Sequence, residues 1–179
     1  MVVFLLQKKL RISEIRKMQI FLPYKSFKKS AETLDFQRLG KQRVEALQII
    51  NIIEANPRKD GLPYKGWINH PCIIMWRKYV SALKLYHNII VNEWIKRGYK
   101  NNMSLYKLND VEILYPNWLG NKKFHLSHRS NLIRKNYAFY KKFKWHVDPI
   151  AGYIWLDKDG NWYEQNITTG ERIYKRNSS

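Results

Sequence analysis

The stretch NHPCIIMWRKYVSALKLYHNIIVNEWIKRGY, residues 69–99, decides the fold class. Asn69-His70-Pro71 supplies a capping residue and a proline suited to a first helical turn, and Gly98 can adopt the left-handed conformation that ends a helix. Between them, apolar residues recur at three- and four-residue spacing along one stripe. These residues are Met75, Trp76, Tyr79, Leu83, Tyr86, Ile90 and Trp94. We therefore predict one long amphipathic helix that ends near Arg97-Gly98.

Helical periodicity also covers residues 36–54, and two further helices are predicted at 125–135 and 137–144. The apolar face of the first is predicted to hold Phe36, Leu39, Ala46, Leu47, Ile50 and Ile53. Near the C-terminus, Asp159-Gly160 lies between two aromatic runs, the strongest short-range signal of a β-hairpin. The prediction is a mainly α protein: a compact single-domain helical bundle with a small C-terminal β-hairpin appendage.

The chain of 179 residues has the size of one domain. Met18 opens the segment Met18-Gln19-Ile20-Phe21-Leu22-Pro23, which resembles a second start. We accordingly divide the chain into an N-terminal extension (1–17), a helical domain (18–150) and a β-hairpin tail (151–179).

Charge indicates the class of partner. Lys and Arg number 33 against 14 acidic residues, which gives a net charge of +19. Such an excess increases self-repulsion in the folded chain, so a polyanionic partner explains it most simply, and we predict nucleic acid. The alternatives are compositional bias, since Lys, Asn and Ile are abundant, or binding to a ribosome or an anionic membrane surface.

Cysteine usage and the first residues indicate the compartment. Cys72 is the single cysteine, so the chain forms no internal disulfide and has no Cys cluster for zinc. The apolar run 2–6 is too short for a signal peptide or a membrane span. We expect a reducing compartment, cytoplasmic, nuclear or within a virion, and a monomer with no membrane, no cofactor and no obligate protein partner.

The helix at 36–54 carries the first candidate site residues. Arg43 falls within the predicted apolar face, where an unpaired charge is costly. Either it meets a carboxylate or carbonyl groups in the core, or that face opens onto a site, or its stem packs while its guanidinium reaches solvent. Arg38, Lys41 and Glu45 share the neighbouring face, either as phosphate contacts or as a solvated face with a Lys41–Glu45 pair.

Two segments further along suit phosphates and bases. Residues 124–135 combine hydroxyls, imidazoles and cations, which fit phosphate contacts or helix capping, whereas a metal site at His125 and His128 lacks a third ligand. In residues 137–146, aromatic rings alternate with lysines, which fits base stacking, an amphipathic core helix, or both. The predicted nucleic-acid contacts are Arg38, Gln42, His70, Arg77, Ser127, His128, Arg129, Arg134, Lys135, Tyr140, Lys141, Lys142 and Trp145, with no metal ligand.

A series of short motifs occurs along the chain in a specific order and spacing. The motifs are Gln37-Arg38-Leu39-Gly40-Lys41-Gln42-Arg43-Val44-Glu45, Asn69-His70-Pro71, Met75-Trp76, Arg97-Gly98-Tyr99, Ser127-His128-Arg129-Ser130 and the aromatic-lysine segment. With these motifs the chain resembles, over residues 18–150, the endonuclease V type of pyrimidine-dimer DNA glycosylase, a family found in phages, bacteria and large DNA viruses.

The resemblance implies a compact helical glycosylase and abasic-site lyase, in which an amine attacks the sugar carbon and a glutamate manages protons. It points to Glu45 as that glutamate, with Arg43 and Lys41 as the other catalytic candidates. In the family the amine belongs to an N-terminal threonine, which neither Met1-Val2 nor Met18-Gln19 reproduces. Lys41, or an α-amino group freed before Gln19, is the substitute. The family's adjacent Arg and Glu are also separated here by Val44, so Arg43 and Glu45 do not share a helix face.

These observations predict a protein that binds double-stranded, possibly damaged DNA and acts in DNA repair or processing, with glycosylase and lyase chemistry. The alternative is a non-catalytic DNA-binding or DNA-packaging protein on the same scaffold. An RNA-binding module is a third possibility.

Overall fold

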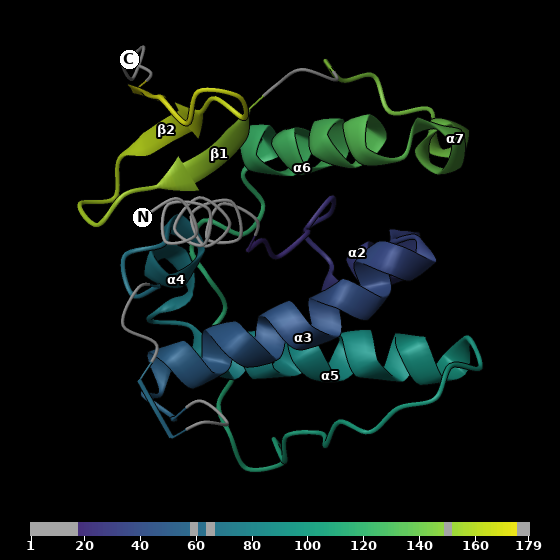
Figure 1. The fold of residues 1–179 in the computed structure, drawn as a ribbon, viewed down its shortest axis with the longest axis vertical. Coiled ribbons are helices and arrows are strands. Elements are labelled where there is room, and N and C mark those ends of the chain that lie inside the picture. The colour runs from purple at the N-terminus through teal and green to yellow at the C-terminus, as the bar shows by residue number, and fades with distance from the viewer. Residues whose placement is uncertain (1–17, 58–60, 64–66, 149–151, 175–179) are drawn as a thin grey trace, which may run out of the picture.

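The computed structural model describes residues 18–57, 61–63, 67–148 and 152–174. Most of the ordered structure is helical, which confirms the mainly α prediction (Figure 1). The predicted extension at 1–17 lies outside the described residues, and the division into domains stays a prediction. The elements are α2 (Phe27–Thr33), α3 (Phe36–Ile53), α4 (Pro71–Trp76), α5 (Val80–Lys96), α6 (Lys122–Lys135), α7 (Tyr137–Tyr140), the 3-10 turn η1 (Lys141–Phe143), β1 (Tyr153–Leu156), β2 (Trp162–Gln165) and β3 (Arg172–Tyr174).

An extended segment, residues 18–25, lies between two helical layers (Figure 1). One layer consists of α3 packed along α5, with α2 beside them, and the other consists of α6 and α7. The Phe21 amide donates to Gln42 Oε1 at 2.9 Å, and the Leu22 amide donates to His128 Nδ1 at 3.0 Å. The segment is therefore fixed by one polar side chain from each layer.

The prediction of one long helix is wrong in one respect, because the structure has two helices there, α4 and α5. Tyr79, with φ −126° and ψ 39°, leaves the helical conformation and begins α5. The division lets α4 pack against β1 while α5 packs along α3, which a single straight helix would not do. The cap of α4 is His70, whose side chain accepts the Cys72 amide at 3.2 Å.

The predicted stop at Gly98 is confirmed. Gly98 has φ +83°, its amide donates to Ile95 at 2.8 Å, and the Tyr99 amide donates to Trp94 at 3.3 Å. These two bonds are the Schellman pattern, which satisfies the last carbonyl groups of a helix.

The buried face of α3 is rotated from the predicted one. Leu39, Ala46 and Ile50 are buried as expected, but Phe36 is 52% exposed and stacks on the Trp94 ring with centroids 5.5 Å apart. The rotation buries two polar residues, Gln42 and Glu45. Tertiary packing, not the apolar periodicity, determines this register.

The C-terminal region forms the predicted hairpin and adds a third strand. The order is β1-β2-β3, all antiparallel, and Leu156 is paired with Trp162 at the end of the β1–β2 ladder. Trp155 and Tyr163 are buried, and β1 packs against α4 and α6. The predicted small C-terminal β element is therefore confirmed; β1 and β2 contribute residues to the core, whereas β3 is exposed.

None of the described helices is long and apolar enough to cross a membrane.

Candidate active site

Glu45 lies at the centre of a polar cluster between α3 and the extended segment. Its side chain is only about 6% exposed. Gln42 Nε2 donates to Glu45 Oε2 at 2.8 Å, and Lys41 Nζ lies 3.4 Å from Glu45 Oε1. The backbone amide of Gln19 also lowers the pKa of the carboxyl group. Gln42 Nε2 joins the two residues, because it donates both to the Gln19 carbonyl and to Glu45 Oε2.

Burial raises the pKa of Glu45 to about 7. The ion pair with Lys41, the positive charge of Lys135 and the Gln19 amide each lower this pKa, but they do not cancel the desolvation. A carboxyl group that titrates near neutral pH can both accept and donate a proton under working conditions. Glu45 consequently has the properties of a general acid–base group.

Gln42 positions this carboxylate. Its Oε1 accepts the Phe21 amide and, at 2.8 Å, the Tyr86 hydroxyl, while its Nε2 donates to the Gln19 carbonyl at 2.7 Å as well as to Glu45. Gln42 is fully buried, so its predicted contact with nucleic acid stays a prediction and would require the side chain to leave this position. Its role in this structure is to hold residues 19–21 against Glu45.

Further cations surround Glu45. The pKa of Lys135, at the end of α6, is lowered by partial desolvation and by the charges of Arg134, Arg38 and Lys41, although its side chain reaches the surface. Arg38 donates to the Lys135 carbonyl at 3.5 Å and pairs with Asp35 at 3.4 Å. The predicted grouping of Arg38, Lys41 and Glu45 is found, and α6 adds an amine that is easier to deprotonate than an ordinary lysine.

Arg43 is separate from this cluster. Its guanidinium lies over the Trp94 ring at 3.9 Å from the centroid, and Nη1 donates to Asn101 Oδ1 at 3.2 Å. Its Nε is buried with no hydrogen-bond partner in the described part of the chain, and burial lowers the pKa of the group. Arg43 and Glu45 therefore project from different faces of α3, as their spacing predicts.

His125 and His128 fasten α6 to the extended segment. His128 is fully buried and accepts the Leu22 amide, while His125 Nδ1 lies 2.7 Å from the Leu22 carbonyl and its Nε2 accepts the Gly120 amide at 3.0 Å. Burial lowers both pKa values, which favours neutral rings. The predicted contact of His128 with phosphates stays a prediction and would require the buried ring to leave this position. Among the residues described, no group of three or more His, Cys, Asp or Glu is placed to hold a metal ion.

Ser127 is likewise a packing residue. It is buried, its hydroxyl donates to the Phe124 carbonyl at 2.8 Å, and it accepts the Ile154 amide of β1 at 3.3 Å. The predicted phosphate contact at Ser127 stays a prediction, and in this structure both hydrogen bonds of the hydroxyl are made within the protein.

A second cluster, here called the aromatic cluster, comprises Tyr24, Arg129, Tyr140, Phe143 and Trp145. The Phe143 and Trp145 rings are stacked at 5.1 Å, Trp145 Nε1 donates to the Tyr24 hydroxyl at 3.0 Å, and the Arg129 guanidinium lies 4.6 Å from the Tyr24 ring centroid. Tyr140 is fully buried and its hydroxyl accepts the Asp35 amide at 3.1 Å, so its predicted contact with DNA stays a prediction and would require the ring to leave the core. Arg129 and Trp145 remain partly exposed. The aromatic cluster thus has a buried part, which includes Tyr140, and an accessible part, which includes Arg129 and Trp145.

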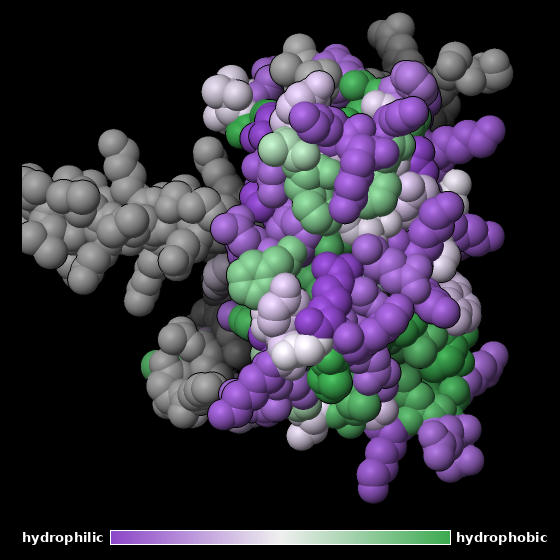
Figure 2. Space-filling view, turned by 90° about the vertical axis from the view of Figure 1, so that its right-hand side faces the viewer, coloured by the Kyte–Doolittle hydropathy of each residue, from purple (hydrophilic) through white to green (hydrophobic). Residues whose placement is uncertain are grey.

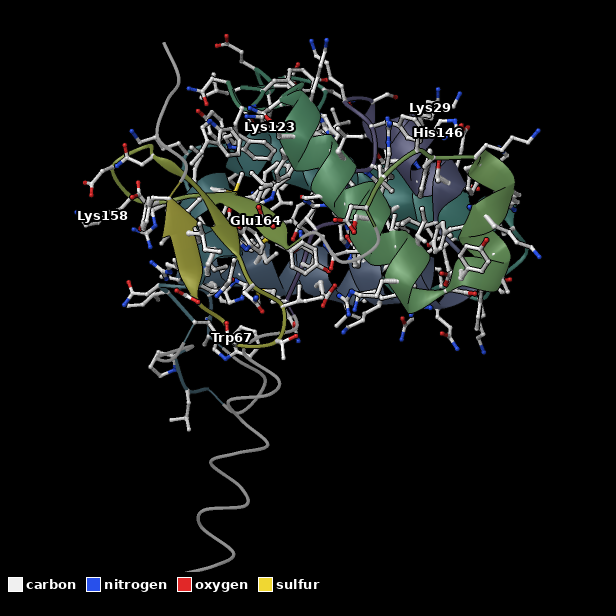
Figure 3. The ribbon with its side chains drawn as sticks, turned by 90° about the horizontal axis from the view of Figure 1, so that it is seen from above. Lys29, Trp67, Lys123, His146, Lys158 and Glu164 are labelled. Atoms are coloured by element: carbon white, nitrogen blue, oxygen red, sulfur yellow. The ribbon has the colours of Figure 1, made fainter. Side chains whose placement is uncertain are left out.

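The remaining predicted contacts are spread over the surface. Arg77 is exposed and donates to the Ile68 carbonyl at 2.7 Å, whereas Lys141 and Lys142 are exposed beside the aromatic cluster. Lys29 and His146 lie at the same end of the molecule (Figure 3). Figure 2 shows a mainly hydrophilic face interrupted by separate hydrophobic patches.

Gln19, Lys41, Gln42, Glu45 and Lys135 are here called the Glu45 cluster. Most of this cluster lies within a region that matches a known family. A family model described as pyrimidine dimer DNA glycosylase matches residues 18–107, which are 90 of the 179 residues. The chain belongs to the pyrimidine dimer DNA glycosylase family. The match contains Gln19, Lys41, Gln42 and Glu45, and it ends before α6. No curated protein and no solved structure gives a match. Membership in the pyrimidine dimer DNA glycosylase family connects the chain with DNA binding and DNA repair at the level of the family.

Proposed function

We propose that this chain is a DNA glycosylase with abasic-site lyase activity on damaged duplex DNA, and that the Glu45 cluster is its active site. One observation carries the proposal: a buried carboxyl group with a pKa of about 7 lies 3.4 Å from Lys41 Nζ and near enough to the Gln19 amide for that amide to lower its pKa. A glycosylase–lyase needs such a pair, an amine to attack and an acid–base group beside it.

The reaction begins when a neutral amine attacks C1′ of the deoxyribose, the bond from C1′ to the base breaks, and the base leaves with a proton from the amine. The nitrogen lone pair then breaks the C1′–O4′ bond while protonated Glu45 gives its proton to O4′, and this yields a protonated imine. The Glu45 carboxylate next removes a proton from C2′, and the electrons expel the 3′ phosphate, so that the strand breaks. Three nitrogens are candidates for the amine: Lys41, Lys135 with its lowered pKa, and the α-amino group that cleavage before Gln19 would create. Only a deprotonated amine attacks, which favours an α-amino group or a lysine near other cations.

Binding of the duplex would use the cations around the cluster. Arg38, Arg134 and Lys135 lie near Glu45, and Arg129 and Trp145 offer a guanidinium and a ring at the aromatic cluster. Contacts of this kind fix the phosphate backbone and lose affinity steeply as salt increases. Removing a damaged base also requires it to leave the stack, which costs less for a damaged pair.

Borohydride trapping tests the chemistry. The full chain is incubated with duplexes that contain an abasic site or a thymine dimer, reduced, and digested, and mass spectrometry identifies the peptide that carries the sugar. We expect an adduct on Gln19, Lys41 or Lys135. Glu45→Gln should slow its formation about 10²- to 10⁴-fold, whereas Lys28→Gln, at an exposed position on α2, should not. If the unaltered chain forms no adduct with either duplex, the proposed activity is wrong.

The second candidate is DNA binding without chemistry. If the chain is not cleaved before Gln19, the Gln19 nitrogen is part of a peptide bond. An amide nitrogen is not nucleophilic, which favours this second function. This function predicts equal affinity for intact and damaged duplexes and no effect of Glu45→Gln on either. The mass of the mature N-terminal peptide distinguishes a free amine at Gln19 from an amide.

A further inference from the structure

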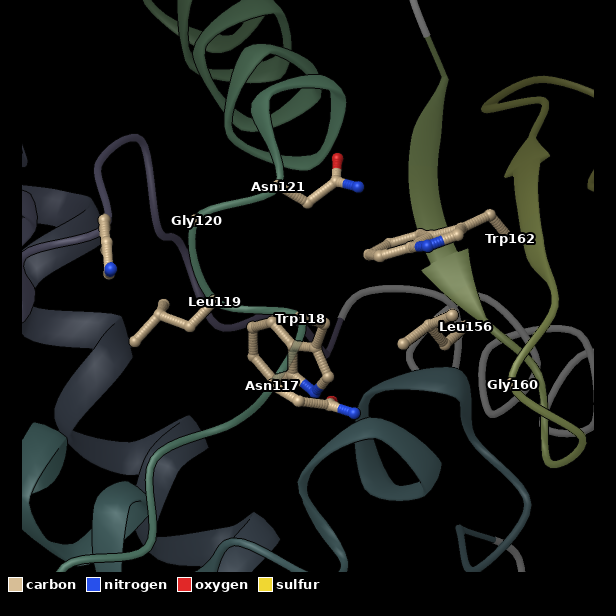
Figure 4. A pocket seen from close by; sticks show the side chains of 9 residues that line it. Asn117, Trp118, Leu119, Gly120, Asn121, Leu156, Gly160 and Trp162 are labelled. Atoms are coloured by element: carbon tan, nitrogen blue, oxygen red, sulfur yellow. The ribbon is translucent and has the colours of Figure 1, made fainter. Parts of the chain in front are cut away.

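A cavity of about 550 Å³ lies between the start of α6, the loop before it and the β1–β2 hairpin (Figure 4). This volume is within the range of small-molecule sites, roughly 300–1,000 Å³. Trp118 and Trp162 project toward the same space, from the loop and from β2 respectively (Figure 4). The lining residues are Lys25, Asn117, Trp118, Leu119, Gly120, Asn121, Leu156, Gly160 and Trp162. All of them except Lys25 lie outside the family match, so the cavity is separate from the part of the chain that the family defines.

The walls combine aromatic surface with hydrogen-bond donors. Trp118 is fixed by its Nε1, which donates to the Met75 carbonyl at 3.2 Å, whereas Trp162 is half-buried and keeps part of its ring exposed. Asn117 Oδ1 accepts the Tyr79 hydroxyl at 3.1 Å, and Asn121 Oδ1 accepts the Phe124 amide at 3.0 Å. In the part of the chain that the structure describes, neither amide Nδ2 makes a hydrogen bond, so both remain available to an acceptor.

The charge of the cavity is positive. Lys25 is exposed, forms no ion pair with any described residue, and is the one charged side chain in the lining. Its side chain passes beside Gly120, where Cδ lies 3.4 Å from the position of an added Cβ. With no lining carboxylate, the cavity favours an anionic ligand, and its indoles favour a planar aromatic one.

We propose that this cavity, here called the tryptophan pocket, binds one nucleotide, with the base stacked on the Trp162 indole and the phosphate toward Lys25. The Nδ2 groups of Asn117 and Asn121 donate to acceptor atoms of the base or the phosphate. The nucleotide is either free or part of a single-stranded segment next to bound DNA. Binding here extends the proposed function but does not involve Glu45, so it is measured equally in the Glu45→Gln variant.

Titration of the full chain with thymidine 5′-monophosphate and with a short oligothymidylate tests the proposal. Calorimetry gives affinity, and the indole NH resonance of Trp162 and the amide resonance of Gly160 report occupancy of the pocket. We expect Trp162→Ala to weaken binding about 5- to 100-fold, as loss of one stacked base predicts. Trp162→Phe should restore most of the affinity because it keeps a ring.

Lys25→Glu provides a test that leaves the packing intact, because Lys25 is exposed. It should weaken binding at least about tenfold, whereas Lys28→Glu, which makes the same charge change on α2, should have a much smaller effect. Saturation by the monophosphate alone identifies a free-nucleotide site, and saturation by the oligothymidylate alone identifies a strand-binding site. Unchanged affinity of both Trp162→Ala and Lys25→Glu for both ligands would overturn the proposal.

Discussion

Replacing Glu45 by Gln should make the stability of the protein less sensitive to alkaline pH. The carboxyl group has a pKa of about 7 in the folded chain and an ordinary value of 4.5. Because the folded pKa is the higher one, the folded chain binds more protons than the unfolded chain between these values. Raising the pH through this window therefore destabilises the fold.

The size of the effect follows from the gap between the two values. At about 1.36 kcal/mol for each unit of pKa, the gap corresponds to about 3 kcal/mol in all, of which roughly 2.5 kcal/mol falls between pH 5 and pH 8. The amide that replaces the carboxyl group of Glu45 keeps the hydrogen bond from Gln42 but turns its NH₂ toward Lys41. Losing the ion pair with Lys41 changes the free energy of unfolding whether or not residue 45 titrates. The informative quantity is therefore the difference in the free energy of unfolding between the variant and the unaltered chain, followed as a function of pH.

Urea unfolding at several pH values between 5 and 8, at constant ionic strength, measures this difference. The free energy of unfolding of Glu45→Gln, relative to the unaltered chain, should increase by about 2.5 kcal/mol from pH 5 to pH 8. Glu112→Gln removes one negative charge at an exposed position and is the matched control. A constant difference over the whole range would refute the argument that a buried, protonatable Glu45 destabilises the folded state. The same variant should lose lyase activity, as expected where a strained site is kept for function.

Three further changes test the packing around the site. Lys41→Gln removes the cation that lowers the Glu45 pKa, so this pKa should increase above about 7, which NMR titration of the Glu45 carboxyl would detect. Gly40→Ala places a Cβ 2.9 Å from the Trp94 ring; overpacking should outweigh the better helix propensity and destabilise the protein by about 1 kcal/mol in urea unfolding. Gln42→Ala leaves the buried Phe21 amide without its acceptor and the Tyr86 hydroxyl with only the Phe21 carbonyl at 3.2 Å. It should reduce the unfolding free energy by about 2–4 kcal/mol, whereas a loss below about 0.5 kcal/mol would show that water replaces the amide.

Several features could be predicted from the sequence because their causes are local. The existence of α3, the stop at Gly98 and the β1–β2 hairpin each depend on periodicity or on a residue with special backbone freedom. The Lys41–Glu45 pair also follows from spacing on one helix. Each of these involves residues within a few positions of one another.

Other features depend on contacts between distant segments, and the sequence alone predicted them wrongly or not at all. Ser127, His128 and Tyr140 have the chemistry of phosphate or base contacts, yet the packing of α6 and α7 directs them into the core. The break before α5 could not be predicted from an uninterrupted apolar stripe. It goes with the packing of α4 against β1, a strand that lies far away in the sequence. Side-chain type shows what a residue can bind, whereas burial decides whether it is accessible.

By itself the sequence determined the helical class and the positive charge, because composition and periodicity are properties of the chain. The resemblance of its motifs to a known family indicated Glu45 as the candidate acid–base residue. Only the tertiary structure brought the Gln19 nitrogen and Lys135 to Glu45, across 26 and 90 positions of sequence. The pKa of about 7 has the same origin, since desolvation depends on which segments cover the carboxyl group and has no signature in the order of residues.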